Sequence, residues 1–359
     1  MKTDLEFMAR ALQLAERGRF TTDPNPRVGC VLVKNGRIIG EGFHERAGQA
    51  HAEINALKNA TENTNGATAY VTLEPCSHHG KTPPCCDALI AAGIKRLIVA
   101  MSDPNPLVAG RGLERCNAAG IEIVSDVLRA DAEKLNRGFI SRMMRNRPFI
   151  RSKIAMSLDG KTALANGESQ WITSQEARAD VHCFRAESSA ILTGIGTILA
   201  DNPSLNARVN FPIVQPIRVI LDSNLQMPHD SQMAKLDGRI LVLTCSTNEQ
   251  KFTVLKQAGF EIYVLPESNG RLNLNAVMEF LAAQEINNVF VEAGATLNGA
   301  LLEAGLVDEW LIYMAPCVLG NKGRGAFALP ELQSMTDKKM LQWRDVRHVG
   351  ADLRLTLSF

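Results

Sequence analysis

The stretch His51-Ala52-Glu53, followed by Pro75-Cys76 and then by Cys85, decides how the first part of this chain folds and reacts. One histidine and two cysteines can bind a zinc ion, and three protein ligands leave a fourth position for water, as a catalytic zinc needs. Glu53 is not required as a ligand, so its carboxylate is a candidate to transfer protons. The combination predicts hydrolytic removal of an amino group from a nitrogen heterocycle.

The elements expected around these ligands favour a metal site. His51 directly precedes a predicted helix, and Cys85 opens another after two prolines. The partial positive charge at a helix N-terminus favours thiolate over thiol. Cys76 follows a predicted strand at its carboxyl end, where α/β sheets bind their ligands. We therefore expect the three side chains to meet at one edge of a sheet.

The identity of the third ligand stays open at this point. The usual deaminase signature ends in P-C-x-x-C, whereas eight residues separate Cys76 from Cys85 here. Cys86 competes with Cys85, and spacing does not choose between them. The alternative to a catalytic zinc is a closed, four-coordinate structural site in a nucleotide-binding sensor, in which Glu53 would be dispensable.

Working outward, helical and strand patterns alternate from residue 4 to residue 119. An amphipathic helix opens the chain, and Asn35-Gly36 predicts a tight hairpin turn between two strands. The alternation implies an α/β layer sandwich with a mixed sheet. The expected strands are 29–33, 37–42, 67–73 and 96–101, and the expected helices begin near residues 5, 52, 86 and 113.

A second alternating series follows a basic segment that ends at Pro148, and we place a domain boundary there, giving domains 1–147 and 148–359. Gly194-Ile195-Gly196 resembles the start of a dinucleotide fingerprint but lacks the third glycine. The segment 294–299 follows a strand and opens a helix, so it could bind phosphate or be an ordinary turn. The expected strands are 149–156, 190–193, 217–222, 239–243, 261–265, 288–292, 310–315 and 351–359.

Bulk properties narrow the class of protein. With 359 residues and 45% hydrophobic residues, the chain can bury two cores. A net charge of +1 and the absence of a basic stripe argue against a nucleic-acid partner. No apolar run reaches membrane-spanning length and no signal-peptide core is evident, so we expect a cytoplasmic protein. Its eight cysteines are then metal ligands or core residues rather than disulfides.

Long motifs in both halves resemble the bifunctional riboflavin-biosynthesis deaminase–reductase family. The motifs that carry the resemblance are Thr22-Asp23-Pro24-Asn25-Pro26, Val28-Gly29-Cys30, Leu73 to Cys85, Asp103-Pro104-Asn105-Pro106, Gly110-Arg111-Gly112, Ser157-Leu158-Asp159-Gly160-Lys161, Gly167 to Thr173, Leu199 to Pro203, Glu292-Ala293-Gly294 and Thr296-Leu297. The resemblance implies a cytidine-deaminase-like αβα sandwich with zinc, followed by a dihydrofolate-reductase-like domain that uses NADPH. It covers almost the whole chain.

For the first domain, the resemblance implies zinc ligands His51, Cys76 and Cys85, and it thus favours Cys85 over Cys86. The implied substrate is a diaminopyrimidinone that carries a ribosylamino 5′-phosphate. The loop between the two cysteines would cover this substrate, and Lys81 would meet its phosphate. The residues implied to contact the substrate are Asn25, His44, His78, Lys81, Asp103 and Asn105.

For the second domain, the resemblance implies NADPH-dependent reduction of the ribosyl group to a ribityl chain. The implied substrate residues are Lys153, Ser169, Arg185, Leu205, Arg208 and Glu292. The implied cofactor residues are Ala155, Trp171, Thr197, Asp201, Ser223, Gly294, Ala295, Thr296, Leu297, Asn298, Gly299 and Ala300. The two arginines suit a phosphate because guanidinium groups grip it bidentately.

Three further expectations follow. Lys153 is a hypothetical group for polarising the opening sugar. Asp222 ends a strand, and a carboxylate there often binds a ribose 2′-hydroxyl and disfavours NADPH, so this residue is in tension with the expected cofactor. The family implies a homo-oligomer, with a dimer favoured.

A rival function keeps the deaminase chemistry but acts on a free nucleoside or a tRNA base. The Lys81 loop and the large second domain argue against this alternative.

Overall fold

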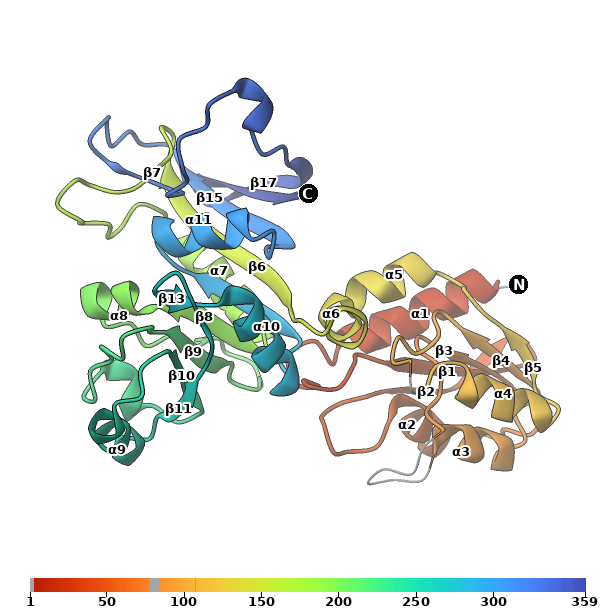
Figure 1. The fold of residues 1–359 in the computed structure, drawn as a ribbon. Helices are drawn as coiled ribbons and strands as arrows, with labels where there is room; N and C mark the ends of the chain where they lie inside the picture. Colours follow the sequence, from red (N-terminus) through yellow and green to blue (C-terminus); the bar gives the residue numbers. More distant parts are fainter. Residues whose placement is uncertain (1–2, 78–83, 107) are drawn as a thin grey trace. The chain divides into compact units, whose positions relative to one another are not determined.

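The computed structural model describes residues 3–77, 84–106 and 108–359, and the chain forms two compact units (Figure 1). The first comprises Met1–Arg147 together with Pro212–Val214, and the second comprises Pro148–Phe211 and Gln215–Phe359. Each is a layered α/β structure with its own core. Within the described residues, no helix has the length and apolar character needed to cross a membrane.

The first unit contains a five-stranded mixed sheet in the order β2-β1-β3-β4-β5. Its strand β1 is antiparallel to both neighbours, whereas β3, β4 and β5 are parallel. Asn35 and Gly36 have φ of 50° and 75°, the left-handed values that a tight hairpin turn requires, so the predicted hairpin is confirmed. The strands are β1 (Gly29–Lys34), β2 (Arg37–Phe43), β3 (Thr68–Val71), β4 (Arg96–Val99) and β5 (Glu122–Val124).

Helices cover both faces of this sheet. Successive side chains in the middle of β1 point to opposite faces and all are apolar, so both faces must be covered. Cys30 and Leu32 pack with helices α2, α3 and α4, while Val31 and Val33 pack with α1 and α5. The helices approach closely: a Cβ on Gly29 would lie 2.0 Å from the Ala11 carbonyl oxygen. The predicted sandwich is therefore confirmed. The helices are α1 (Asp4–Glu16), α2 (Ala52–Lys58), α3 (Cys85–Ala91), α4 (Arg111–Ala118), α5 (Arg129–Leu135) and α6 (Arg137–Arg145).

The second unit contains a nine-stranded sheet in the order β11-β10-β9-β8-β14-β6-β15-β18-β17. All pairings from β11 to β15 are parallel, and the last three strands pair antiparallel. The strands are β6 (Phe149–Ser157), β8 (Ala190–Gly194), β9 (Ile217–Leu221), β10 (Ile240–Thr244), β11 (Glu261–Val264), β14 (Asn288–Glu292), β15 (Glu309–Ala315), β17 (Gln342–Val349) and β18 (Asp352–Ser358). The short pairs are β7 (Lys161–Ala163) with β16 (Arg324–Gly325), and β12 (Glu267–Ser268) with β13 (Arg271–Leu272).

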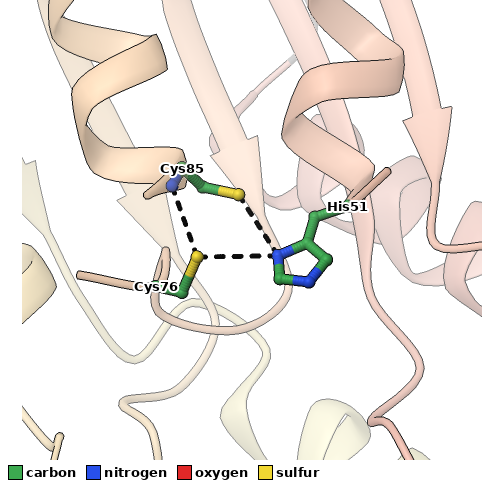
Figure 2. Close-up of side chains that lie close together, drawn as sticks. All are labelled: His51, Cys76 and Cys85. Carbon is green, nitrogen blue, oxygen red and sulfur yellow. Dashed lines mark hydrogen bonds between the residues drawn. The ribbon is translucent and has the colours of Figure 1, made fainter. Parts of the chain in front are cut away.

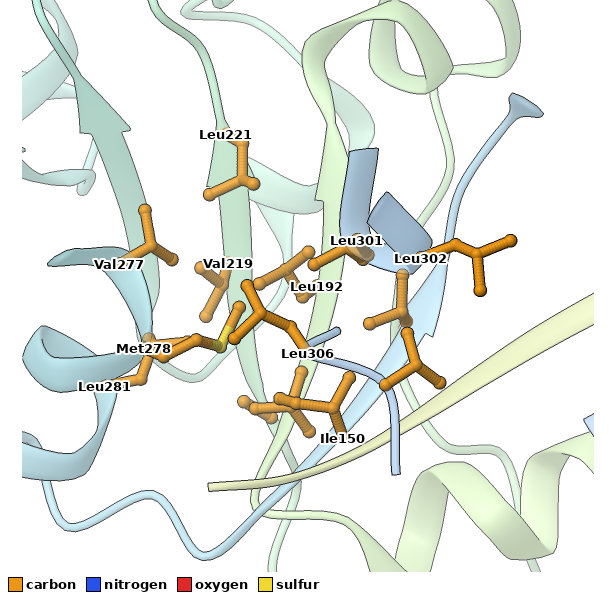
Figure 3. Packing of buried hydrophobic residues seen from close by; sticks show 14 of the residues in the cluster. Ile150, Leu192, Val219, Leu221, Val277, Met278, Leu281, Leu301, Leu302 and Leu306 are labelled. Carbon is orange, nitrogen blue, oxygen red and sulfur yellow. The ribbon is translucent and has the colours of Figure 1, made fainter. Parts of the chain in front are cut away.

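The largest core of this unit lies between the sheet and helices α10 and α11 (Figure 3). Met278 and Leu281 of α10 and Leu301 of α11 are almost completely buried, and each such side chain contributes roughly 1.5–3 kcal/mol. Smaller clusters on the opposite face involve α7, α8 and α9. The helices are α7 (Gln175–Glu187), α8 (Ile195–Asp201), α9 (Glu249–Gln257), α10 (Leu274–Ala283) and α11 (Ala295–Glu303), with 3-10 turns Gln232–Lys235 and Met335–Asp337.

The parallel register brings a polar residue in the middle of β6 next to the last residue of β14. Glu292 pairs with Lys153 across these strands, so their side chains lie on the same face. On this face, Phe290 packs against α7, so the residues of α7 are brought over Lys153 and Glu292.

Candidate active sites

The predicted zinc ligands of the first unit lie together (Figure 2). The Nδ1 atom of His51 is 3.5 Å from Cys76 Sγ and 3.3 Å from Cys85 Sγ, and the Cys85 N–H donates to Cys76 Sγ at 3.3 Å. His51 is the N-cap of α2, and Cys85 is the first residue of α3. The three ligand atoms lie within 4.8 Å of one another.

These distances fit zinc. Tetrahedral zinc with usual Zn–S and Zn–N bond lengths places sulfur and nitrogen ligands about 3.6 Å apart. The two sulfur–nitrogen distances of 3.3 and 3.5 Å are close to this value. One imidazole and two thiols are also the donor set that zinc prefers among divalent ions with open catalytic positions.

The electrostatics favour a metal-binding thiolate. A hydrogen bond from Cys85, helped by one from His51, lowers the pKa of the Cys76 thiol to about 4, although burial acts in the opposite direction. The same bond to Cys76, together with burial, raises the pKa of Cys85. Cys76 is therefore the more acidic of the two thiols, and any proton on either sulfur must leave when the metal binds.

Glu53 is the second residue of α2 and lies beside the ligands. Its side chain is 3% exposed and within hydrogen-bonding range of Cys85. Burial raises the pKa of the Glu53 carboxyl to about 7. A buried carboxyl next to an open metal position is suited to carry protons between a water and a leaving group.

Cys86 faces away from this cluster. Its thiol donates to the Asp87 carboxylate, with sulfur and oxygen 3.7 Å apart, and Asp87 in turn pairs with Arg115 of α4. The sequence alone left Cys85 and Cys86 as alternatives. The structure selects Cys85 because successive residues at a helix start point in different directions.

Two of the predicted substrate residues lie beside the zinc ligands. The His44 ring meets the His51 ring edge-on, with 5.3 Å between ring centroids. Its Nδ1 pairs with the Ala50 carbonyl at 3.1 Å and its Nε2 with the Asn25 amide nitrogen at 3.0 Å. Both bonds are satisfied when Nδ1 carries the proton, so the Asn25 amide is held in place by a neutral imidazole.

Asp103 and Asn105 belong to a loop that runs toward α4. The Asp103 carboxylate accepts the Asn105 N–H at 2.8 Å, which is an Asx turn. The predicted contacts of His78 and Lys81 with substrate lie outside the described residues.

Glu74, the second residue of the Leu73 to Cys85 motif, has a structural role that the sequence did not predict. Its buried carboxylate accepts the backbone N–H groups of Asp103 at 3.1 Å, Gly110 at 3.0 Å and Gly112 at 2.9 Å. A side chain on Gly112 would clash with Pro75, at 2.0 Å from its carbonyl oxygen. Glu74 thus joins the segment that carries Cys76 to the Asp103 loop. A charged residue directly after a buried strand was the only signal in the sequence.

In the second unit, Arg185 and Glu292 form the centre of the predicted substrate site. Arg185 Nε and Nη2 donate to the two carboxylate oxygens of Glu292, the latter at 2.9 Å, and Arg185 Nη1 donates to the Asn206 carbonyl at 3.0 Å. Burial acts to raise the pKa of Glu292, but Arg185 and Lys153 lower it. Burial lowers the pKa of Lys153. We call Lys153, Arg185, Arg208 and Glu292 the cationic cluster.

The remaining predicted substrate residues lie differently. Arg208 is exposed, and its guanidinium donates to the Asn206 side chain at 3.3 Å. The Leu205 side chain is 2% exposed and belongs to the core, so only its main chain can meet a ligand. Ser169 is partly exposed in the loop between β7 and α7, and no hydrogen bond in the described part of the chain links it to the cationic cluster.

The predicted cofactor residues fall into two groups. Gly294 and Thr296 are exposed at the start of α11, and no side chain caps this helix. Asn298 and Gly299 are buried instead: the Asn298 amide bonds Ser152 and Ala293, and a Cβ on Gly299 would lie 2.0 Å from the Ala328 carbonyl oxygen. Their conformation is therefore set by packing, which narrows the candidate phosphate site to 294–297. Ala295, Leu297 and Ala300 are partly exposed.

The other cofactor candidates come from separate elements. Trp171 is 70% exposed, with the Arg178 guanidinium 4.4 Å from its ring centroid. Ser223 accepts the Leu272 N–H at 3.1 Å through its hydroxyl. Ala155 lies on β6, two residues beyond Lys153, and both Thr197 and Asp201 lie on α8.

Asp222 does not create the expected conflict with NADPH. Its side chain is fully buried, and its carboxylate accepts the Met227 N–H at 2.8 Å. It shapes the turn after β9 rather than facing a ligand. The burial of this carboxylate argues against a contact with a ribose hydroxyl, and the preference for NADPH over NADH stays a prediction.

Comparison with known proteins identifies both halves of the chain. The family described as the RibD C-terminal domain matches residues 148–355, and the cytidine and deoxycytidylate deaminase zinc-binding region matches residues 1–101. The riboflavin biosynthesis protein RibD of Escherichia coli is 49% identical over 366 residues, covering 99% of each chain. The chain belongs to the RibD family.

Other members of the RibD family align with this chain over almost its whole length. RibD of Haemophilus influenzae is 47% identical over 99% of this chain and 97% of its own. The structure of Acinetobacter baumannii RibD, form 1, aligns with a TM-score of 0.93 and 43% identity, covering 99% of this chain and 98% of that one. A Thermotoga maritima deaminase/reductase aligns with a TM-score of 0.87 and 34% identity, covering 99% and 98%.

Membership of this family confirms the resemblance seen in the sequence motifs and the predicted fold of both domains. The protein is a bifunctional deaminase and reductase of riboflavin biosynthesis, with a cytidine-deaminase-like zinc-binding domain and a dihydrofolate-reductase-like RibD reductase domain. The expected zinc site at His51, Cys76 and Cys85 is likewise confirmed, and the RibD reductase domain implies NADPH as the reductant.

Proposed function

We propose that this protein removes ammonia from a diaminopyrimidinone ribosylamino 5′-phosphate and then reduces the ribosyl group with NADPH, giving 5-amino-6-ribitylaminouracil 5′-phosphate. The Thermotoga maritima relative carries these two activities in its name. The observation that carries the proposal is the convergence of His51, Cys76 and Cys85 beside the buried carboxyl of Glu53. This is the arrangement needed for hydrolysis of an exocyclic amine.

In the deaminase step, the residues of the first unit bind the ring and move protons. Zinc held by His51, Cys76 and Cys85 would supply Lewis-acid activation of water. Glu53 takes a proton from the attacking water and returns one to the amino group, so that a carbon–oxygen bond replaces the carbon–nitrogen bond and ammonia leaves. Asn25, fixed by His44, and Asp103 and Asn105, on the loop held by Glu74, orient the pyrimidine.

In the reductase step, the sugar ring opens to an imine between its first carbon and the attached nitrogen. Bound NADPH would supply the hydride that this carbon accepts, and the nitrogen would take up a proton. We assign Lys153 Nζ as the proton donor to the ribose ring oxygen during opening, because it lies beside Glu292 and its pKa is lowered by burial. Arg185 and Arg208 of the cationic cluster bind the phosphate, with Ser169 and the Leu205 main chain nearby.

The proposed cofactor site lies at the start of α11, directly after β14. We propose that the N–H groups at residues 294–297 face the NADPH diphosphate, because a helix start without a side-chain cap offers unpaired donors. Trp171, Ala155, Thr197, Asp201 and Ser223 would border the rest of the cofactor. A higher reductase kcat/KM with NADPH than with NADH is expected.

We also propose that the protein acts in the cytoplasm as a homo-oligomer, with a dimer favoured. All eight cysteines are free, which suits a compartment that keeps thiols reduced. The near-neutral charge supports a small-molecule substrate rather than a nucleic acid. Light scattering on the full chain tests the oligomeric state.

One experiment tests both activities. The diaminopyrimidinone ribosyl phosphate is supplied to the zinc-loaded full chain with and without NADPH, and the products are identified by mass. We expect ammonia and the ribosylaminouracil phosphate without NADPH, and the ribityl product only with it. Failure to release ammonia from this substrate, while a free cytidine is deaminated, would contradict the assigned substrate.

A further inference from the structure

His182 of α7 forms an unassigned contact with the proposed phosphate site. The backbone N–H of Arg208, 26 residues further along the chain, donates to His182 Nδ1 at 3.1 Å. A backbone N–H can only donate, so Nδ1 accepts and the ring carries its proton on Nε2. His182 also lies three residues before Arg185, so the two share one face of the helix.

The segment 205–208 is held from several sides. The Leu205 side chain is buried in the core. The Gln215 side chain accepts the Ala207 N–H at 3.1 Å and donates to the Ala207 carbonyl at 2.8 Å. The bond from Arg208 to His182 then joins the end of this segment to α7. This bond fixes the main chain at Arg208, where the side chain begins, and so limits the region that the guanidinium can reach.

The charge of the cationic cluster indicates what Arg208 faces. Lys153, Arg185 and Arg208 carry three positive charges, and Glu292 carries one negative charge. Among the described residues, Arg185 already uses three of its five N–H groups on Glu292 and Asn206, whereas the exposed Arg208 guanidinium makes one bond, to Asn206. Two positive charges remain uncompensated, which matches a phosphate dianion, and Arg208 has the most donors left for it.

We propose that His182 is a positioning residue of the reductase site, which fixes Arg208 so that its guanidinium meets the phosphate of the ribosylaminouracil substrate. This inference rests on the proposed function, since it takes that substrate and its phosphate site as given. His182 acts through its Nδ1 acceptor and not through direct contact with the reacting carbon. It should therefore affect substrate binding more than the hydride-transfer rate.

Three substitutions of His182 distinguish the acceptor role of Nδ1 from the donor role of Nε2. His182→Asn keeps an acceptor near the Nδ1 position, His182→Gln keeps a donor near the Nε2 position, and His182→Ala removes both. The exposed His348→Asn is the matched control. For each full-length, zinc-loaded variant, the measurements are reductase KM and kcat with the ribosylaminouracil phosphate, the NADPH Kd, ammonia release by the deaminase, and Tm.

We expect His182→Ala and His182→Gln to raise the reductase KM about tenfold, which is the loss from one misplaced charge-assisted contact. In both, kcat, NADPH affinity and ammonia release should stay near wild type, and His182→Asn should restore the KM. With the dephosphorylated substrate, the wild type and all three variants should show the same KM.

The opposite pattern would overturn the inference. If His182→Gln binds the phosphate substrate normally while His182→Asn does not, the Nε2–H contacts the ligand and Arg208 is not positioned by Nδ1. An unchanged KM in all variants would show that the Arg208 bond is dispensable. Both results presuppose that the wild type reduces the phosphate substrate with NADPH; if it does not, the proposed function fails first, and separately from the role of His182.

Discussion

The guanidinium of Arg185 and the carboxylate of Glu292 form a two-pronged ion pair that joins α7 to the carboxyl end of β14. Both side chains are largely buried, at 13% and 15% exposure. The pair therefore sits where removing one partner leaves a poorly solvated charge. Because Lys153 is opposite Glu292 on β6, this pair also sets the charge felt by the proposed proton donor.

Replacing Arg185 by lysine should damage the reductase and spare the deaminase. A single ammonium cannot bond both Glu292 oxygens and Asn206 at once. We expect reductase kcat/KM to fall about 10- to 100-fold, as for loss of a charge-assisted bond in a partly buried site. Steady-state NADPH oxidation and ammonia release measure the two activities.

The matched control is Arg239→Lys. Arg239 and Glu261 form the same two-pronged pair at 2.8 Å for both bonds, but on the exposed surface. This substitution should leave both activities unchanged and should cost less than about 1 kcal/mol of stability. Equal reductase losses in both variants would refute a specific role for Arg185.

Substituting Glu53 by glutamine should abolish ammonia release while zinc stays bound. The amide keeps the volume of this buried side chain but cannot accept and return a proton, a contribution of about 10²–10⁴ in rate. NADPH-dependent reduction of supplied ribosylaminouracil phosphate should persist. The exposed Glu62→Gln is the control, and retained ammonia release in Glu53→Gln would point to a structural zinc site.

The two neighbouring cysteines should differ in zinc binding. Cys85→Ser removes a thiolate ligand next to His51 Nδ1 and should lower the zinc content of the purified protein and abolish deaminase activity. Cys86→Ser should keep one zinc per chain, because Cys86 faces Asp87 rather than His51. The zinc content per chain of both variants tests this prediction. Zinc loss only in Cys86→Ser would show that Cys86, not Cys85, is the third ligand.

Asp159 predicts a change of stability with pH. Hydrogen bonds from Ser157 and from the Leu319 and Gly320 N–H groups lower the pKa of its carboxyl from 3.8 to about 2. A folded-state pKa below the unfolded value stabilises the fold above pH 3.8, and this contribution is lost as the pH falls toward about 2.

The Tm of Asp159→Asn, measured against pH, tests this linkage. The variant should melt below wild type at neutral pH, and the two melting curves should converge as the pH falls toward about 2. The exposed Asp230→Asn should follow the wild type throughout. A Tm difference that does not depend on pH would show that the charge of Asp159 is not what matters.

Much of the fold could be predicted because its signals are local. The apolar run from Cys30 to Val33 indicated a strand, which the structure buries on both faces, and Asn35-Gly36 indicated the turn. Strand β17 was not predicted because six of its eight residues are exposed, so it has no apolar alternation; its pairing with β18 defines it. Helices α5 and α6 were missed for a similar reason, since few of their side chains are buried.

Residue types and their spacing were enough to predict the chemistry: a histidine, two cysteines and a glutamate suit zinc-dependent deamination, and long motifs resemble one family. The folded chain was needed to show that Cys85 rather than Cys86 faces His51, that Glu74 accepts three N–H groups, that Asp222 turns inward and that His182 accepts the Arg208 N–H. Residue types and local periodicity can be read along the chain, whereas the direction of a side chain depends on packing between segments far apart in sequence.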